Sequence, residues 1–359
     1  MSTRMRRATF PVPRITRGPS VYATPEVSRE WRLVSRPMGR PKPRDFMLRT
    51  VPLPAPGPGQ VLVRNLMMSV DPYTCGRAHE TRTDSPSRLL GESIDGPAVG
   101  IIVVSAAKGL AAGDYVTHYR GWCDYLTLHT DLVTAIDVTM AAPSTYLSVL
   151  GDPGLTAYAG LIRMGELKSG DTVFVSGAAD AVGGIAGQIA KLKGAGRVVG
   201  SADSDEKVNL LTEEYGFDAA FNYQGGPATD QLKQAAPNGI DLYFDNEGGE
   251  HLETVMENLV LGGRIVMAET PLQQTATAPS VSVRNLLRLE PERLRIRGLT
   301  LNDHTDLRPE FIHEAGAWLQ GGNLHYRETI VNGLNNAVDA FFAMMEGANT
   351  GKMIIKMDN

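Results

Sequence analysis

The segment Ser176-Gly-Ala-Ala-Asp-Ala-Val-Gly-Gly184 combines residue types and a spacing that suit nucleotide chemistry. Strand-like apolar residues 172–176 precede it, and an apolar pattern of helical period follows over 185–193. A glycine-rich turn between a strand and a helix lets a diphosphate approach the backbone N–H groups at the helix N-terminus. The segment therefore predicts the diphosphate site of a dinucleotide, in the first strand–turn–helix unit of a parallel sheet.

The residues after Gly151 repeat this alternation of strand and helix patterns. Ser204 is expected to cap a helix that runs through Leu211 and carries Lys207 in its first turns. Further strand-like runs follow at 197–201, 219–222, 240–244, 264–267 and 294–300. Strands that alternate with helices in this way predict a doubly wound parallel sheet with a dinucleotide-binding architecture.

Residues 50–150 have a different sequence pattern, in which glycine and proline separate short strand-like runs. The clearest strands lie at 60–65, 98–105 and 113–118, which favours a compact β-barrel domain. The last strand, 352–356, is expected to return to this barrel. We therefore expect a basic flexible arm over 1–28, a barrel domain formed by 29–150 and 329–359, and a Rossmann domain over 151–328.

Composition excludes several classes of protein. The chain has 359 residues, which suits two domains, with 42% hydrophobic and 21% charged residues. A net charge of -5 argues against a nucleic-acid partner, and no apolar run is long enough to span a membrane. Two cysteines, Cys75 and Cys123, are too few for a disulfide framework or a structural zinc lobe, so we expect no metal and a cytoplasmic location.

The sequence resembles the zinc-independent medium-chain dehydrogenase/reductases, in the branch of prostaglandin reductases and alkenal double-bond reductases. The resemblance extends from about Trp31 to Lys356. It is carried, in order, by Ser69-Val-Asp-Pro-Tyr73, Pro153-Gly-Leu-Thr-Ala-Tyr158, Gln188-Ile-Ala-Lys-Leu-Lys-Gly194, Ser204-Asp-Glu-Lys207, Gly216-Phe-Asp-Ala-Ala-Phe-Asn-Tyr223, Tyr243-Phe-Asp-Asn246 and Tyr326-Arg-Glu328.

The resemblance implies a GroES-like catalytic barrel, an NADP(H)-binding Rossmann domain and a cleft between them. It also implies a small-molecule substrate and a homodimer joined through the Rossmann sheet edge near 294–300. Members deliver hydride from NADPH to an α,β-unsaturated ketone or aldehyde without a metal.

Six positions of the sequence match coenzyme contacts of this family. Val182 and Gly183 belong to the phosphate turn, Lys207 is implied to meet the 2′-phosphate of NADPH, and Tyr223 is implied to lie at the same end. Asn246 and Asn349 are implied to lie on the nicotinamide side.

Acidic residues mark the departures from the family pattern. The acids Asp152, Asp180, Asp203, Glu247 and Glu269 stand where the family has glycine or an apolar residue, Asp95 stands where it has a basic or neutral one, and Gln274 replaces a tyrosine of the cleft. A carboxylate in the phosphate turn would crowd and repel a diphosphate. Taken singly, Asp180 could instead cap the helix at Ala181, and Glu269 could pair with Arg264.

Three hypotheses follow. The first holds that the NADPH site has decayed and that the cleft performs redox-neutral acid/base chemistry, a cyclisation, isomerisation or dehydration of an unsaturated, polyketide-like carbonyl compound. Carboxylates in a desolvated cleft have raised pKa values that suit proton transfer. The second hypothesis retains NADPH-dependent reduction of a C=C bond, and the third is a non-catalytic partner protein. The first is favoured, with these candidate catalytic residues: Tyr73, Asp152, Asp180, Glu247, Glu269 and Gln274.

Overall fold

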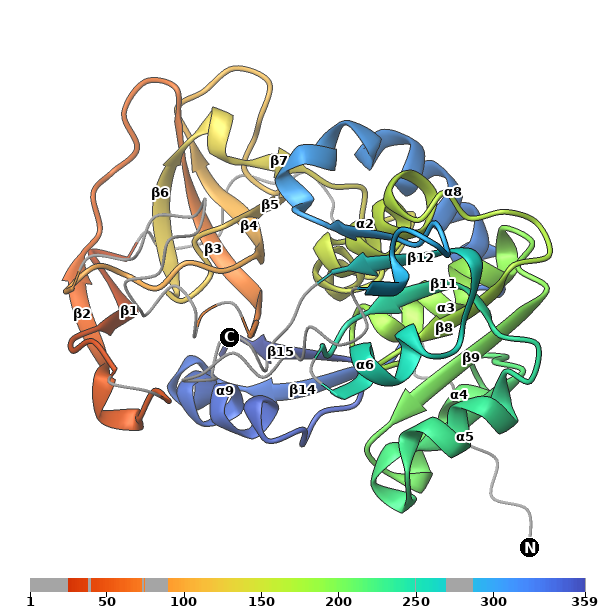
Figure 1. Ribbon diagram of the computed structural model, residues 1–359. Helices are drawn as coiled ribbons and strands as arrows, with labels where there is room; N and C mark the ends of the chain where they lie inside the picture. The colour runs from red at the N-terminus through yellow and green to blue at the C-terminus, as the bar shows by residue number, and fades with distance from the viewer. Residues whose placement is uncertain are drawn as a thin grey trace, which may run out of the picture.

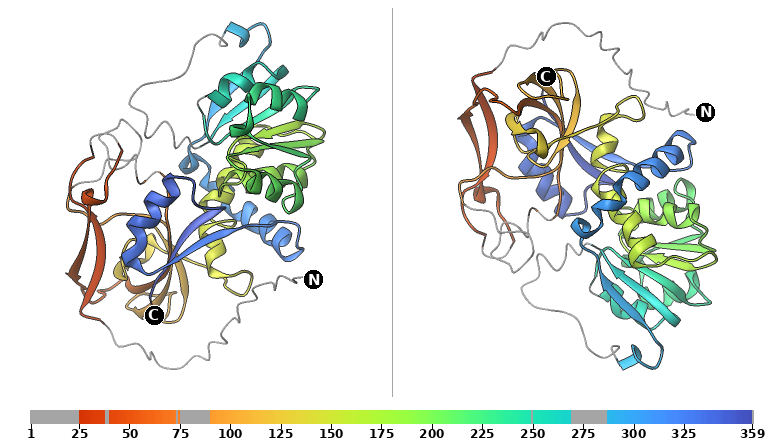
Figure 2. Two further views of the ribbon diagram at one scale, coloured as in Figure 1. Left: turned by 90° about the horizontal axis from the view of Figure 1, so that it is seen from below. Right: turned by 90° about the horizontal axis from the view of Figure 1, so that it is seen from above.

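The computed structural model describes residues 25–37, 40–72, 74, 90–248, 250–268 and 287–358. Two sheets form the two lobes that are visible in Figures 1 and 2. The expected fold class is confirmed, because one lobe contains a GroES-like barrel sheet and the other a Rossmann-type parallel sheet. No helix of these residues combines the length and the apolar character that a membrane crossing needs.

The barrel lobe is a seven-stranded sheet. Its strand order is β14-β15-β3-β4-β5-β7, with β6 paired to β3. The strands are β3 (Gln60–Ser69), β4 (Ala98–Ser105), β5 (Tyr115–His118), β6 (Tyr125–His129), β7 (Thr134–Ala135), β14 (Glu328–Asn332) and β15 (Lys352–Lys356). An antiparallel ribbon of β1 (Val27–Leu33) and β2 (Phe46–Pro52) and the helix α9 (Ala337–Met345) complete the lobe.

The second lobe is a six-stranded parallel sheet in the order β10-β9-β8-β11-β12-β13. Its strands are β8 (Thr172–Val175), β9 (Arg197–Ala202), β10 (Ala219–Asn222), β11 (Ile240–Asp245), β12 (Leu259–Met267) and β13 (Arg295–Gly298). The strand order reverses between β8 and β11, and ligands of such sheets bind beyond the carboxyl ends of the strands at this switch point.

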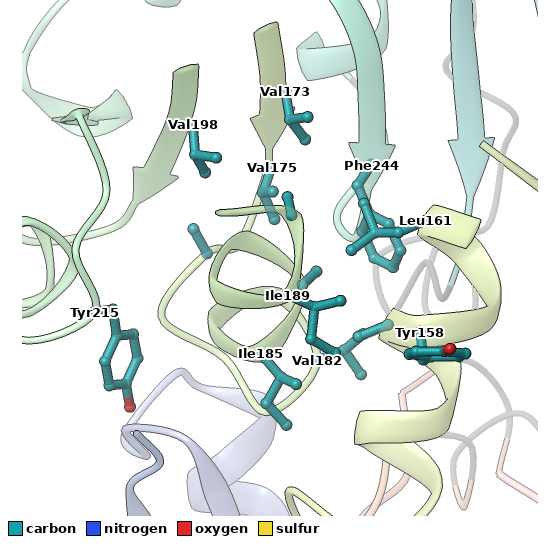
Figure 3. Packing of buried hydrophobic residues seen from close by; sticks show 14 of the residues in the cluster. Tyr158, Leu161, Val173, Val175, Val182, Ile185, Ile189, Val198, Tyr215 and Phe244 are labelled. Carbon is teal, nitrogen blue, oxygen red and sulfur yellow. The ribbon is translucent and has the colours of Figure 1, made fainter. Parts of the chain in front are cut away.

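Helices cover both faces of the parallel sheet. They are α2 (Asp152–Ala159), α3 (Gly183–Leu192), α4 (Asp205–Glu213), α5 (Ala228–Ala235), α6 (Glu250–Met256) and α8 (Arg308–Gln320). Successive strand residues point to opposite faces. Val173 and Val175 therefore pack with Ile185 and Ile189 of α3 (Figure 3), whereas Phe174 belongs to the cluster on the other face.

Two local sequence signals form as expected. Ser204 caps α4, because its hydroxyl accepts a hydrogen bond from the Lys207 N–H at 3.4 Å. The strand β15 lies between β14 and β3, so the C-terminal strand joins the barrel sheet. The edge strand β13 pairs with β12 among the described residues, and the predicted dimer contact at this edge stays a prediction.

Candidate active-site cleft

A cleft of about 360 Å³ lies between the two lobes at the switch point of the parallel sheet. The turn after β8, the residue after β9, the first turn of α4 and the residues after β11 line it from one side. The strand β15 and the residues before it line it from the other side. Its size and its position are those of a small-molecule or coenzyme site.

The glycine-rich turn has the geometry of an anion site. Gly177 has a φ of +55°, and a Cβ atom on Gly183 would lie 2.3 Å from the Gly177 carbonyl oxygen. Gly183 is therefore required for close packing of the helix start against the turn. Val182 is the N-cap of α3 and makes no side-chain capping bond, so a ligand can meet the N-terminus of this helix from the cleft.

Asp180 lines the cleft within this turn. Its Oδ2 atom lies 3.2 Å from the position that a Cβ on Gly177 would take. Enclosure by the protein raises the pKa of Asp180 to about 7, and the charge of Glu247 adds to this effect while Lys207 opposes it. Much of Asp180 is therefore uncharged at neutral pH, and a protonated carboxyl donates a hydrogen bond to a phosphate instead of repelling it.

The acid that precedes α4 is paired within the chain. Lys207 Nζ lies 2.9 Å from Asp203 Oδ2 and donates a hydrogen bond to the Gly347 carbonyl oxygen at 3.2 Å. The Lys207 residue is only 9% exposed. Asp203 Oδ1 is buried and has no hydrogen-bond partner in the described part of the chain.

Glu247 lies beside an imidazole ring. The Nε2 atom of His251 lies 2.8 Å from Glu247 Oε2, and the His251 ring meets the Tyr223 ring edge-to-face at 4.9 Å between centroids. Burial, followed by the charge of Glu247, raises the pKa of the Tyr223 hydroxyl. Glu247 and Tyr223 both line the cleft, so this cluster forms one of its walls.

The two predicted asparagines also line the cleft. The Asn246 N–H donates to Ser176 Oγ at 3.0 Å, which ties the end of β11 to the end of β8. The buried carboxylate of Asp245 fixes the same turn by accepting the Gly248 N–H at 2.6 Å. Asn349 Nδ2 donates to the Gly351 carbonyl oxygen at 2.7 Å from the opposite side of the cleft.

Asp152 lies apart from the other carboxylates, contrary to the sequence-based expectation. It begins α2 and does not line the cleft that the described residues form. Its carboxylate accepts a hydrogen bond from the Tyr119 hydroxyl at 2.7 Å and lies 2.7 Å from Arg308 Nη2. With an arginine and a tyrosine from distant parts of the chain as partners, Asp152 has a structural role in holding these segments together.

The sequence analysis offered two structural roles for the acids, a helix cap for Asp180 and an ion pair with Arg264 for Glu269. Asp180 does not cap α3, because Val182 occupies the N-cap. Arg264 is paired with Asp171 at 2.6 Å. The predicted site residues Tyr73, Glu269 and Gln274, together with Cys75 and the arm up to residue 24, lie outside the described residues.

Two cleft residues, Arg40 and Lys352, were not among the predicted site residues, and neither was Asp71, which lies beside the cleft. Lys352 is 4% exposed, and its ammonium group contacts the carboxylate of Asp71 and donates to the Val70 carbonyl oxygen at 3.1 Å. Lys352 and Arg40 line the cleft, and Asp71 lies directly beside its wall. The available signal was a lysine in the otherwise apolar strand 352–356, because a buried lysine requires a partner.

The described residues contain no group of three or more His, Cys, Asp or Glu side chains that could hold a metal ion. The thiol of Cys123 is buried, and Asn65 Nδ2 lies 3.5 Å from its sulfur.

Comparison with known proteins identifies the family. Residues 29–136 match the N-terminal domain of oxidoreductase, and residues 181–315 match the model described as zinc-binding dehydrogenase. The chain is 36% identical to the NADPH-dependent curcumin reductase of Escherichia coli, over 92% of this chain and 97% of that protein. It is also 36% identical to prostaglandin reductase 1 of Oryctolagus cuniculus, over 90% of this chain and 92% of that protein.

A solved structure agrees with these matches. CurA from Vibrio vulnificus in complex with NADPH has a TM-score of 0.87 and 34% sequence identity, and the alignment covers 92% of this chain and 99% of CurA.

The favoured hypothesis of redox-neutral acid/base chemistry is wrong, because the curcumin reductase is NADPH-dependent, both named relatives are reductases, and CurA binds NADPH in its crystal structure. The physical error lies in counting each acid of the cleft as a free negative charge. Asp180 has a pKa raised to about 7, Asp203 and Glu247 each have a basic partner, and Asp152 lies elsewhere. Similarity over about nine-tenths of the chain shows that this protein belongs to the medium-chain dehydrogenase/reductase superfamily, in the branch of prostaglandin and alkenal reductases.

Proposed function

We propose that this protein reduces the C=C bond of α,β-unsaturated ketones or aldehydes with a reduced nicotinamide dinucleotide held in the cleft. The observation that carries the proposal is the N-terminus of α3, which has no side-chain cap and opens onto a cleft that both lobes line. The names of the relatives support an enzyme of this class and NADPH as a coenzyme, since they include a curcumin reductase and a 2-alkenal reductase.

The residues of the cleft fit a dinucleotide. The turn from Gly177 to Val182 is suited to bind the diphosphate through backbone N–H groups, and protonated Asp180 adds a hydrogen-bond donor. Asp203, Lys207 and Tyr223 gather at one end, where the second strand of a Rossmann fold places the adenosine ribose. Asn246 and Asn349 provide amide groups toward the nicotinamide end.

The bound coenzyme supplies the hydride, and the protein supplies orientation, exclusion of water and polarisation of the substrate carbonyl. Family resemblance gives Tyr73 the role of a phenolic hydrogen-bond donor to that carbonyl oxygen. A donor in this position stabilises the negative charge that develops on oxygen when hydride adds to a conjugated C=C bond.

Kinetics with the full-length protein test the proposal. We expect nicotinamide absorbance to fall with an alkenal or a phenyl-substituted enone, and mass spectrometry of the product to show two added hydrogens with the carbonyl retained. The saturated ketone of the same skeleton is the matched control and should consume no coenzyme. Coenzyme binding without reduction of any enone, or reduction of the carbonyl instead of the C=C bond, would contradict the proposed reaction.

A further inference from the structure

We propose that Asp203 is the acceptor for the adenosine ribose diol of NADH, and that this protein uses NADH at least as readily as NADPH. The inference rests on the proposed function, because it concerns the coenzyme of the same cleft. It goes beyond that function by assigning the coenzyme choice to one carboxylate of this chain, in contrast to its NADPH-dependent relatives.

The position of Asp203 in the fold supports this role. It follows Ala202, the last residue of β9, and β9 lies beside β8, whose turn faces the cleft. Asp203 lies 20 residues after Gly183. In Rossmann folds, an acidic residue about 20 residues after the glycine-rich turn binds the ribose 2′-hydroxyl of NAD, and a 2′-phosphate requires a basic residue instead.

The two carboxylate oxygens of Asp203 have different surroundings. Oδ2 is 2.9 Å from Lys207 Nζ, whereas Oδ1 is buried and lacks a hydrogen-bond partner in the described part of the chain. The Asp203 side chain is 28% exposed and lines the cleft, so a rotation of its carboxylate would offer the unpartnered oxygen to a ribose hydroxyl, which is a hydrogen-bond donor. A 2′-phosphate in the same place would set a second anion against the carboxylate.

Lys207 already has an anionic partner within the chain. Its ammonium group is held between Asp203 and the Gly347 carbonyl oxygen, 3.2 Å away, and the residue is 9% exposed. A 2′-phosphate on the remaining donor of Lys207 would lie beside the Asp203 carboxylate, so Asp203 weakens the attraction that Lys207 offers to it.

The other cations that line the described cleft have acidic neighbours too. Arg40 lies 3.7 Å from Glu346 and donates to the Met345 carbonyl oxygen at 3.4 Å, and Lys352 contacts Asp71. The Asp203 carboxylate beside Lys207 therefore favours a neutral diol over a phosphate that carries up to two negative charges.

Binding to the full-length protein tests the inference without any requirement for turnover. Calorimetry gives the dissociation constants of NADH and NADPH, and adenosine 5′-monophosphate and adenosine 2′,5′-bisphosphate serve as probes of the ribose end alone. The variants are Asp203→Asn, which keeps the shape and removes the charge, and Asp203→Gly. Glu206→Gln is the matched control, because it removes one exposed negative charge from the first turn of α4 outside the cleft lining.

We expect the wild-type protein to bind NADH at least as tightly as NADPH. Both Asp203 variants should shift the ratio of the two affinities at least tenfold toward NADPH, with a parallel shift between the adenosine probes, while Glu206→Gln leaves the ratio within twofold. A wild-type preference for NADPH, or an unchanged ratio in Asp203→Asn, would overturn the inference and leave the proposed reductase intact. Failure of wild type and variants to bind either coenzyme would overturn both.

Discussion

The carboxylate of Asp152 connects the two lobes. It accepts a hydrogen bond from the Tyr119 hydroxyl at 2.7 Å and lies 2.7 Å from the guanidinium of Arg308. Tyr119 follows β5 of the barrel sheet, whereas Asp152 and Arg308 begin α2 and α8. Asp152→Ala would remove a hydrogen bond, a partly exposed ion pair and an acid from the first turn of α2. We expect a loss of about 1–2 kcal/mol in the free energy of unfolding.

Urea unfolding measures this loss. Asp306→Ala is the control, because the Arg163–Asp306 pair is more exposed and its removal should change the stability by less than about 0.5 kcal/mol. Coenzyme affinity should stay within threefold in both variants, since Asp152 does not line the described cleft. Weak coenzyme binding by a stably folded Asp152→Ala protein would contradict this structural role.

Asp180 should make coenzyme affinity depend on pH. Its pKa is raised to about 7 from a usual value of 3.8, mainly by burial. Below pH 7 the carboxyl is protonated and can donate to the diphosphate, and above it the carboxylate repels the diphosphate. The dissociation constant of NADH should therefore rise with pH, by up to about tenfold per unit above pH 7.

NADH is the correct probe for this titration because it lacks a 2′-phosphate that would itself ionise near pH 6. Calorimetry between about pH 6 and pH 8 measures the effect. Asp180→Asn keeps a polar group of similar shape and should give a nearly flat profile. A pH-independent affinity in the wild-type protein would show that the Asp180 carboxyl does not face the diphosphate.

Lys352 and Asp71 form a buried ion pair beside the cleft, so removal of one partner should be more harmful than removal of both charges. We expect Lys352→Met to lower the free energy of unfolding by about 3–5 kcal/mol, because it leaves the Asp71 carboxylate buried without its cation. Adding Asp71→Asn should restore part of this loss. A double-mutant cycle by denaturant unfolding measures the coupling, and strictly additive losses would contradict it.

The edge strand β13 is expected to join two copies of the chain into one continuous sheet. Sedimentation equilibrium should then give twice the mass of 38.7 kDa. A Cβ atom at Gly298 would meet no atom of the described residues within 4 Å, so Gly298→Lys should fold normally. Its charge at the sheet edge should favour the monomer. A wild-type monomer would contradict the predicted dimer.

Local signals in the sequence were enough to predict the strand–turn–helix unit and the Ser204 cap. The glycines of a turn, the period of apolar residues and a capping hydroxyl each depend on residues that are close together in the sequence. The pairs Asp203–Lys207 and Glu247–His251 each span four residues, and in both the acid precedes the helix that carries its basic partner. The error was to count these acids as unpaired.

Long-range contacts could not be predicted from local patterns. The raised pKa of Asp180 depends on burial and on Glu247, which is far away in the sequence. The partners of Asp152 lie 33 and 156 residues from it, and the contact of Lys352 with Asp71 spans 281 residues. These environments exist only once the chain has folded, because each joins segments that are far apart in the sequence.

The parallel backbone bridge between Asp180 and Gly351 ties the turn after β8 to the strand that enters the barrel sheet. The Gly351 N–H donates to the Ala179 carbonyl oxygen at 3.1 Å, so this tie consists of main-chain atoms that no side-chain substitution removes. A hinge motion that separated the lobes at this point would have to break it. The turn after β8 and the start of β15 should therefore move as one unit when other parts of the cleft open or close.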